Sequence, residues 1–257
     1  MLTNKIVLIT GASSGIGALA ARYAAERGAV PVLAARSEDK LRTAAAAVPG
    51  PHGIRLLDVG SAESVRRAVS ETVEEYGRID VLVNNAGYGL FETAEDMSLG
   101  DYEGIMNVNY FGVVRCTKEV LPIMRKQGGG QIVTVASMAG KFATAKSAGY
   151  AASKHAALGF MNSLRQELRG SGIAVSSVNP GPIDTPFFDT ADPDGSYVKS
   201  VKKFILPPEK VAGQIVRIME TRKDEIDLPR YLGLLVRLYG LMPRTADKLA
   251  GRFLNLK

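Results

Sequence analysis

The chain has 257 residues, a length typical of one large α/β domain. Hydrophobic residues make up 46% of the chain and charged residues 23%, as in an ordinary globular protein with a sizeable core. The formal net charge of +6 is moderate and comes without long Lys/Arg runs interleaved with aromatic residues, which argues against nucleic acid as a partner. We expect a single domain over residues 1–257, with a C-terminal extension.

The first apolar run is short and is interrupted by Thr10 and Gly11, so we expect neither a signal peptide nor a membrane span there. The rest of the sequence offers no uncharged apolar stretch long enough to cross a bilayer. The single cysteine, Cys116, excludes an internal disulfide and fits a reducing compartment. These features predict a cytoplasmic protein.

Short apolar runs alternate with longer segments of helical spacing along the whole chain. The apolar runs predict seven strands, at residues 5–10, 30–35, 54–58, 79–83, 131–136, 173–178 and 225–228. The intervening segments predict helices at residues 15–27, 38–48, 62–76, 99–126, 148–169 and 208–221. A strand followed by a helix, repeated in this way, predicts an α/β fold with a doubly wound, seven-stranded parallel sheet of the Rossmann type and helices on both faces.

Residues 187–206 interrupt the alternation just after the sixth predicted strand. Ligands of such sheets bind beyond the carboxyl ends of the strands, so this insertion is a candidate substrate lid. A surface loop with a short helix is the alternative, and it does not exclude a lid.

A glycine-rich segment, TGASSGIG, follows the first predicted strand and opens the first predicted helix. Such a turn lets backbone N–H groups approach a pyrophosphate at the positive end of the helix. The spacing is Gly-xxx-Gly-x-Gly rather than GxGxxG, and glycine clusters can also be simple tight turns. The candidate cofactor-binding residues here are Gly11, Ser13, Ser14, Gly15, Ile16 and Gly17.

The second predicted strand ends at Ala35 and is followed by Arg36, where NAD-binding sheets place a carboxylate for the ribose 2′-hydroxyl. A carboxylate would repel a 2′-phosphate, whereas Arg36 can form charge-assisted hydrogen bonds with one. We therefore predict NADP(H) as the cofactor in preference to NAD(H). The alternative is that Arg36 only solvates the end of the strand.

Two more strand ends carry candidate cofactor contacts. Asp58 and Val59 close the third predicted strand, where a carboxylate can accept a hydrogen bond from the adenine amino group. Asn85, Ala86 and Gly87 follow the fourth strand, and their pattern is typical of a backbone that packs along a dinucleotide. Asparagine and glycine in this position can also be turn residues alone.

Tyr150 and Lys154 lie four residues apart, and therefore on one face of a predicted helix. A nearby cation favours the phenolate and lowers the pKa of a tyrosine, which makes the pair a candidate general acid or base. Such a pair alone is common on solvated helix faces. Ser137, at the end of the fifth strand, can fold back to place its hydroxyl beside that of Tyr150. Asn109 is a poor helix former within residues 99–126, which indicates either a polar role or a local kink.

Taken together, these motifs resemble those of the short-chain dehydrogenase/reductase family, in its roughly 250-residue form. The elements that match in order and spacing over residues 1 to about 185 are TGASSGIG, Asp58, the NNAG segment, Asn109, Ser137, YAASK and Asn179–Gly181. The resemblance implies a catalytic tetrad of Asn109, Ser137, Tyr150 and Lys154, and hydride exchange between a nicotinamide and a carbonyl or alcohol carbon. No metal is expected.

The same resemblance implies a role for each residue. Ser137 would polarise the carbonyl oxygen, Tyr150 would protonate it, and Lys154 would lower the pKa of Tyr150 and hold the nicotinamide ribose. Asn109 would anchor a water molecule that connects Lys154 to solvent. Four residues would cradle the nicotinamide: Pro180, Gly181, Ile183 and Thr185. A homodimer or homotetramer built on helices 99–126 and 148–169 is expected.

The C-terminal segment, residues 229–257, is apolar and basic. Its helical spacing places Arg230, Gly233, Arg237, Gly240 and Arg244 on one narrow stripe of an otherwise apolar helix, which must bury most of its surface. Its own domain, another subunit and an anionic membrane surface are the three candidate partners. Packing over the substrate cleft or a subunit contact is favoured, because an interfacial helix usually has a wider polar face.

Several aromatic or apolar side chains could line a substrate pocket or belong to the core; they are Tyr88, Leu90, Phe91, Met138, Phe187, Phe188, Tyr197 and Phe204. The favoured function is an NADPH-dependent carbonyl reductase, or the reverse alcohol dehydrogenase, for an apolar or lipid-like small molecule. The alternative is a non-catalytic sensor or scaffold that binds NADPH, and a methyltransferase is poorly supported.

Overall fold

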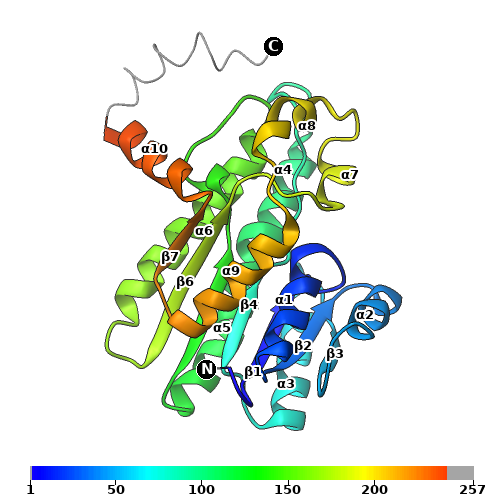
Figure 1. The fold of residues 1–257 in the computed structure, drawn as a ribbon, viewed down its shortest axis with the longest axis vertical. Helices are drawn as coiled ribbons and strands as arrows, with labels where there is room; N and C mark the ends of the chain where they lie inside the picture. Colours follow the sequence, from blue (N-terminus) through cyan, green and yellow to red (C-terminus); the bar gives the residue numbers. More distant parts are fainter. Residues whose placement is uncertain (1, 242–257) are drawn as a thin grey trace.

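The structure is a computed structural model, and it describes residues 2–241. A seven-stranded sheet with strand order β3-β2-β1-β4-β5-β6-β7 forms its centre, and every neighbouring pair of strands is parallel (Figure 1). The strands are β1 Ile6–Thr10, β2 Val30–Ala35, β3 Gly53–Leu56, β4 Val81–Asn84, β5 Gly130–Val135, β6 Ile173–Pro180 and β7 Glu225–Leu228. The predicted doubly wound fold is confirmed.

Helices connect the strands and cover both faces of the sheet. The longer ones are α1 Gly15–Glu26, α2 Glu38–Ala45, α3 Ala62–Tyr76, α5 Gly112–Lys126, α6 Ala148–Glu167 and α9 Pro208–Thr221. The strands are apolar on both sides because each face packs against a separate core. One core includes side chains of α1, α2 and α9, and the other includes side chains of α3, α5 and α6.

The predicted helix over residues 99–126 consists of three segments: α4 Leu99–Met106, the π-helical turn η1 Asn107–Phe111, and α5. The amide of Gly112 donates to the Asn107 carbonyl, the wider i to i+5 register of a π-turn. Position 112 requires glycine, because a Cβ there would lie 2.8 Å from Val59 Cγ2. The polar residue Asn109 lies inside this turn, so the local irregularity that its sequence indicated is present.

The insertion at residues 187–206 contains three short helices, α7 Phe187–Ala191, α8 Ser196–Val201 and the 3-10 turn η3 Lys202–Phe204. The Asp192 carboxylate stabilises the first turn of α8 by accepting hydrogen bonds from the backbone N–H groups of Tyr197 (3.1 Å) and Val198 (2.8 Å). The Phe91 amide donates to Ala191 O at 2.8 Å, which ties the insertion to the loop after β4. A short 3-10 helix, η2 Met138–Gly140, follows β5.

The last described helix, α10 Arg230–Leu241, contacts β7 at one edge of the sheet (Figure 1). This described part of the C-terminal segment therefore packs against its own domain, one of the three alternatives that its sequence left open. Arg244, like the rest of residues 242–257, lies outside the described residues. Within residues 2–241, no helix has the length and apolar character that crossing a membrane requires.

Candidate active site

The candidate site lies where β1 and β4 end side by side, the point at which the order of the strands reverses. Open α/β sheets bind ligands beyond the carboxyl ends of the strands at such a point. The glycine-rich loop leaves β1 here and the NNAG segment leaves β4 here, so two of the predicted motifs meet at one edge of the sheet.

Close contact between these two loops explains the glycines. Gly11 and Gly15 have φ values of +64° and +55°, which favour glycine. A Cβ at Gly11 would lie 2.8 Å from Ala86 Cα, and a Cβ at Gly17 would lie 2.5 Å from both Gly11 O and Asn85 Nδ2. The loop after β1 is therefore packed tightly enough to exclude side chains at Gly11 and Gly17.

Thr10 and Asn85 hold the two loops together. The Thr10 hydroxyl accepts the backbone N–H groups of Asn85 and Ala86, each at 3.0 Å, and donates to Val83 O at 3.3 Å. The Asn85 side-chain amide donates to the carbonyls of Thr10 and Gly11 at 3.0 and 3.1 Å. Thr10 was not among the predicted site residues, although its polar side chain at the end of an apolar strand was a usable signal.

The residues around this loop fit a dinucleotide. Ser14 precedes α1 in an extended conformation and makes no side-chain cap hydrogen bond, which leaves the first N–H groups of the helix to a ligand. Ser13 and Ser14 retain solvent access, while Ile16 packs against the core and anchors the loop. A pyrophosphate binds where the backbone can approach it closely and offers N–H donors. The glycine-rich loop and the start of α1 provide both features.

Two exposed charged residues lie on one side of the glycine-rich loop, beyond the ends of β2 and β3. Arg36 follows β2, is exposed, and makes no hydrogen bond or ion pair with the residues that the structure describes. Asp58 lies two residues beyond the end of β3, and its Oδ1 accepts the Gly60 amide at 2.8 Å. Val59 is buried, and its carbonyl accepts a hydrogen bond from Arg115 at 3.1 Å. The free guanidinium and the exposed carboxylate remain available to a ligand.

Ser137 and Tyr150 come together as predicted from the sequence. Ser137 follows β5 and is buried, with its Oγ accepting the Ala139 amide at 3.0 Å and donating to Pro180 O at 3.4 Å. Tyr150 lies in the first turn of α6, and its phenol lies close enough to Ser137 for that side chain to lower its pKa. Two hydroxyls from elements thirteen residues apart in sequence thus meet at one point.

Lys154 lies one turn further along α6 and is buried, with 6% of its surface exposed. Its Nζ donates to Val135 O at 3.1 Å and lies 5.7 Å from the centroid of the Tyr150 ring. A Cβ at Gly87 would lie 3.5 Å from this Nζ, so Lys154 is adjacent to the loop after β4. The ammonium therefore lies close both to the phenol ring of Tyr150 and to Gly87, one of the predicted cofactor contacts.

Asn109 is 1% exposed and uses its whole side-chain amide to hold two segments in place. Its Oδ1 accepts the Tyr88 amide at 3.0 Å, and its Nδ2 donates to Tyr88 O at 2.8 Å and to Ser153 Oγ at 3.0 Å. The Ser153 hydroxyl in turn donates to Tyr150 O at 2.8 Å. The π-turn therefore positions Asn109 as a brace between the loop after β4 and the helix that carries Tyr150.

The ionisation of the pair differs from the expectation drawn from its spacing. Burial raises the pKa of Tyr150 to about 12, and the neighbouring Ser137 only partly opposes this. Burial also lowers the pKa of Lys154 to about 8. For the residues of the chain alone, the pKa of Tyr150 is therefore raised rather than lowered, and the Lys154 ammonium donates to Val135 O.

The predicted nicotinamide contacts lie at the carboxyl end of β6. Pro180 O accepts the Ser137 hydroxyl, and the Gly181 amide donates to Leu228 O at 2.7 Å. Thr185 faces the glycine loop, since a Cβ at Gly15 would lie 3.7 Å from its side chain. Ile183 forms a bridge with Leu206, at the end of the insertion. This segment therefore spans the space between the glycine loop and the hydroxyls of Ser137 and Tyr150.

An aromatic cluster, consisting of Phe91, Phe187, Phe188 and Tyr197, covers Tyr150. Phe91 and Phe187 contact the Tyr150 ring, with centroids 5.9 and 5.6 Å away, and Phe91 stacks on Tyr197 at 4.0 Å. Two other pocket candidates do not fit this role, because Phe204 is 51% exposed and Met138 is buried, with 2% of its surface exposed. The insertion thus presents an apolar aromatic surface to the candidate acid.

Comparison with known proteins gives a consistent picture. The family model for short chain dehydrogenases matches residues 5–195. The 3-oxoacyl-(acyl-carrier-protein) reductase FabG of Thermotoga maritima is 38% identical over 240 residues, which cover 91% of this chain and 97% of that protein.

Two solved structures share the fold. The 3-ketoacyl-(acyl-carrier-protein) reductase of Brucella melitensis, complexed with NADH, has a TM-score of 0.83 at 26% identity, covering 90% of this chain and 99% of that one. The alcohol dehydrogenase of Thermococcus sibiricus, complexed with 5-hydroxy-NADP, has a TM-score of 0.77 at 29% identity, covering 87% and 95%. Both cofactor forms therefore occur among proteins of this fold.

Proposed function

The chain belongs to the short-chain dehydrogenase/reductase family of oxidoreductases, and we propose that it is an NADP(H)-dependent carbonyl reductase for apolar or lipid-like small molecules. The observation that carries the proposal is the proximity of Ser137 and Tyr150, with Lys154 buried beside the phenol. A protein that only binds a dinucleotide has no evident use for two hydroxyls placed together in this way.

Each residue of the tetrad has a chemical role in this proposal. When bound, NADPH supplies a hydride to the carbonyl carbon of the substrate. Ser137 donates a hydrogen bond to the carbonyl oxygen, and Tyr150 donates its phenolic proton to the same oxygen. Lys154 holds the ribose hydroxyls, and Asn109 keeps the loop after β4 and helix α6 in register. The anchoring of a water molecule by Asn109 remains part of the proposal.

The cofactor would lie along the residues that form the carboxyl edge of the sheet. Gly11, Gly15 and Gly17, with Ser13, Ser14 and Ile16, would hold the pyrophosphate at the start of α1, and Asp58 and Val59 the adenine. Asn85, Ala86 and Gly87 would pack along the dinucleotide, and Pro180, Gly181, Ile183 and Thr185 would hold the nicotinamide. The preference for NADP(H) rests on Arg36, because its exposed guanidinium is free to pair with a 2′-phosphate.

The substrate class follows from the side chains that cover the acid. The aromatic cluster offers ring faces and only one hydroxyl, that of Tyr197, whose pKa is raised by burial and by Asp192. Such a surface favours apolar substrates with an isolated carbonyl over polyhydroxylated ones. Residues 187–206 would act as the lid of this site.

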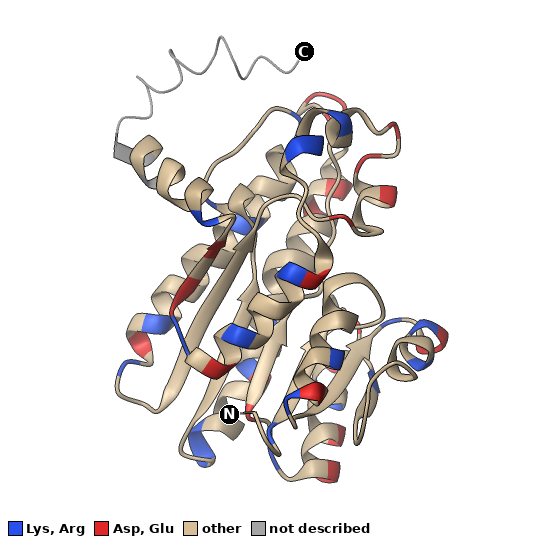
Figure 2. Ribbon diagram, in the orientation of Figure 1, with Lys and Arg blue, Asp and Glu red and all other residues tan. Residues whose placement is uncertain are grey.

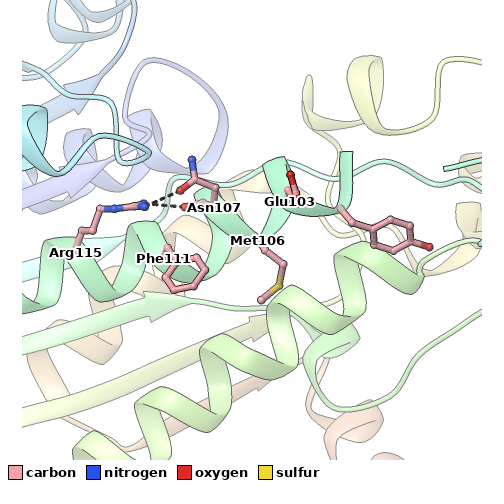
Figure 3. A pocket seen from close by; sticks show the side chains of 6 residues that line it. Glu103, Met106, Asn107, Phe111 and Arg115 are labelled. Atoms are coloured by element: carbon pink, nitrogen blue, oxygen red, sulfur yellow. Dashed lines mark hydrogen bonds between the residues drawn. The ribbon is translucent and has the colours of Figure 1, made fainter. Parts of the chain in front are cut away.

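A homodimer or homotetramer is part of the proposal. The α4–η1–α5 surface has a hollow of about 460 Å³, and Figure 3 shows the side chains that line it. They are Tyr102, Glu103, Met106, Asn107, Phe111 and Arg115. Leu99 and Phe111 on the same segment are 73% and 47% exposed. Exposed apolar side chains on one continuous helical segment are typical of a subunit contact.

The substitution Tyr150→Phe tests the proposed function. We expect turnover of ketones and aldehydes to fall by at least 10²-fold, about the contribution of a general acid, with little change in NADPH affinity. Absorbance of NADPH measures turnover, and cofactor fluorescence measures binding. Tyr76→Phe, at the end of α3, is the matched control.

Two outcomes would contradict the proposal. Substantial turnover by the Tyr150→Phe enzyme would remove the assigned acid. Tight NADPH binding by the wild-type protein, without oxidation of NADPH across a broad panel of carbonyl compounds, would favour the non-catalytic sensor instead.

A further inference from the structure

Helix α10 exposes an apolar stripe to solvent. Tyr231, Leu234, Leu235 and Leu238 are 55–61% exposed, and their i, i+3, i+4, i+7 spacing places them on one face of the helix. Of the eight large apolar side chains whose exposure the structure describes as high, half thus lie on a single helix of twelve residues. Contiguous apolar surface of this kind marks an interaction site.

The orientation of this stripe is fixed by contact with β7. Gly233 is buried, and a Cβ there would overlap the Asp227 carboxylate, so the helix lies directly against the edge strand. Because Gly233 faces the strand, the stripe faces away from the domain. Figure 1 shows the helix extending beyond the edge of the sheet, beside β7.

A cationic hollow adjoins the stripe. It has a volume of about 360 Å³, and three exposed cations line it, Arg217 from α9, Lys223 from the turn before β7, and Arg230 at the start of α10. Within the described part of the chain, none of these three side chains makes a hydrogen bond or an ion pair. Leu234 lines the hollow too, so the cationic and apolar surfaces are continuous.

The two carboxylates that line the same hollow already have partners, one lysine and one side-chain amide. Lys141 Nζ lies 2.6 Å from Asp227 and 3.0 Å from Glu225, and the Asn179 amide donates to both at 2.8 and 2.7 Å. Figure 2 shows these acidic residues on β7, beside a helix that carries none. The three lining cations therefore face solvent with no carboxylate paired to them.

The charge of the whole chain is concentrated here. Residues 229–257 contain six Lys or Arg residues and one Asp, which gives +5 of the formal +6, whereas residues 1–228 are close to neutral with 26 Lys or Arg residues against 25 Asp or Glu. Two such segments from two copies of the chain would repel each other, whereas an anionic surface would attract them.

We propose that α10 and the hollow formed by Arg217, Lys223 and Arg230 bind the surface of a bilayer that contains anionic phospholipids. The apolar stripe enters the boundary between headgroups and acyl chains, and the three cations bind lipid phosphates. The narrow polar face of the helix, which argued against a membrane, is widened by Arg217 and Lys223 from outside the helix. This surface is independent of the proposed catalytic site.

Co-sedimentation of the full chain with vesicles tests the proposal. We expect binding to vesicles of phosphatidylcholine with about one third phosphatidylglycerol, no binding to phosphatidylcholine alone, and weaker binding as salt is raised. The triple variant Arg217→Gln/Lys223→Gln/Arg230→Gln should lower the partition coefficient on the order of 100-fold, about fivefold for each charge.

A matched variant controls for net charge. Arg67→Gln/Lys126→Gln/Arg169→Gln removes three exposed cations distant in sequence from α10 and should change the partition coefficient by less than about threefold, the effect of long-range charge alone. Leu234→Ser/Leu238→Ser should lower binding by about tenfold or more, whereas Leu99→Ser/Phe204→Ser, at equally exposed positions elsewhere, should not. Circular dichroism establishes that each variant is folded.

Four results would overturn the proposal. Wild-type protein could fail to bind anionic vesicles, or bind both kinds of vesicle equally. The two triple variants could lose binding to the same extent. Leu234→Ser/Leu238→Ser could lower the oligomer mass in light scattering while the wild type ignores vesicles, which would make the stripe a subunit contact.

Discussion

Burial of the Lys154 ammonium makes the stability of this protein depend on pH, and the substitution Lys154→Met measures that dependence. The side chain is 6% exposed, and its hydrogen bond to Val135 O is accompanied by no ion pair with the described residues. Burial lowers its pKa from 10.5 to about 8. The folded protein therefore holds the charged form at a cost that the unfolded chain does not have.

The sign and size of the effect follow from linkage. Below pH 8 Lys154 is protonated in both states, and lowering its pKa to about 8 corresponds to a cost of about 3 kcal/mol in the folded state. Between pH 8 and 10.5 the unfolded chain binds more protons, so stability rises with pH and the cost declines. Methionine removes the charge but also the hydrogen bond to Val135 O, worth about 1 kcal/mol. The variant should therefore be about 2 kcal/mol more stable than the wild type at pH 7, and about equal to it at pH 10.

Urea unfolding at pH 7 and pH 10, without added cofactor, measures this difference. Lys126→Met, at an exposed lysine on α5, is the control. Its free energy of unfolding should differ from that of the wild type by the same amount at pH 7 and at pH 10. Turnover by Lys154→Met should be lost although the fold is stabilised. A variant less stable than the wild type at pH 7, or a difference that is the same at both pH values, would refute the reasoning.

Two further substitutions test the cofactor contacts. Arg36→Asp should lower the affinity for NADPH relative to NADH on the order of 10- to 100-fold, because a charge-assisted phosphate contact is replaced by repulsion; fluorescence titration with both cofactors measures this, and an unchanged ratio would contradict the NADP(H) assignment. Gly17→Ala should abolish NADPH binding in the same titration and lower the melting temperature, because its Cβ would overlap Gly11 O and Asn85 Nδ2, whereas Gly213→Ala in α9, with no atom within 4 Å of the new Cβ, should leave both unchanged.

The sheet and its helices could be predicted because their signals are local and repeated. Strands buried on both faces give continuous apolar runs, and crossovers give helical spacing between them. The π-turn at Asn107–Phe111 could not be placed in this way. It differs from an α-helix by one hydrogen-bond register, which depends on how Gly112 packs on Val59, more than fifty residues away in sequence.

In the candidate site, too, features with a local signal could be predicted, whereas features that depend on distant residues could not. The spacing of Tyr150 and Lys154, and the place of Ser137 after a strand, were sufficient to predict which groups meet. The direction of the pKa shifts was not predictable, because it depends on desolvation by Phe91 and Phe187, from two distant segments. The cationic hollow beside α10 could likewise not be predicted from the sequence of the helix, because Arg217 and Lys223 come from earlier elements.

The ionisation of the pair also bears on the direction of the reaction. With a pKa of about 12, Tyr150 is protonated at neutral pH, which is the form that a carbonyl needs when it accepts a hydride. Oxidation of an alcohol would need the phenolate, and burial makes that form costly while Lys154 directs its ammonium to Val135 O rather than to the phenol. The residues of the chain therefore hold Tyr150 in the protonated form, which is the form that the proposed reduction uses.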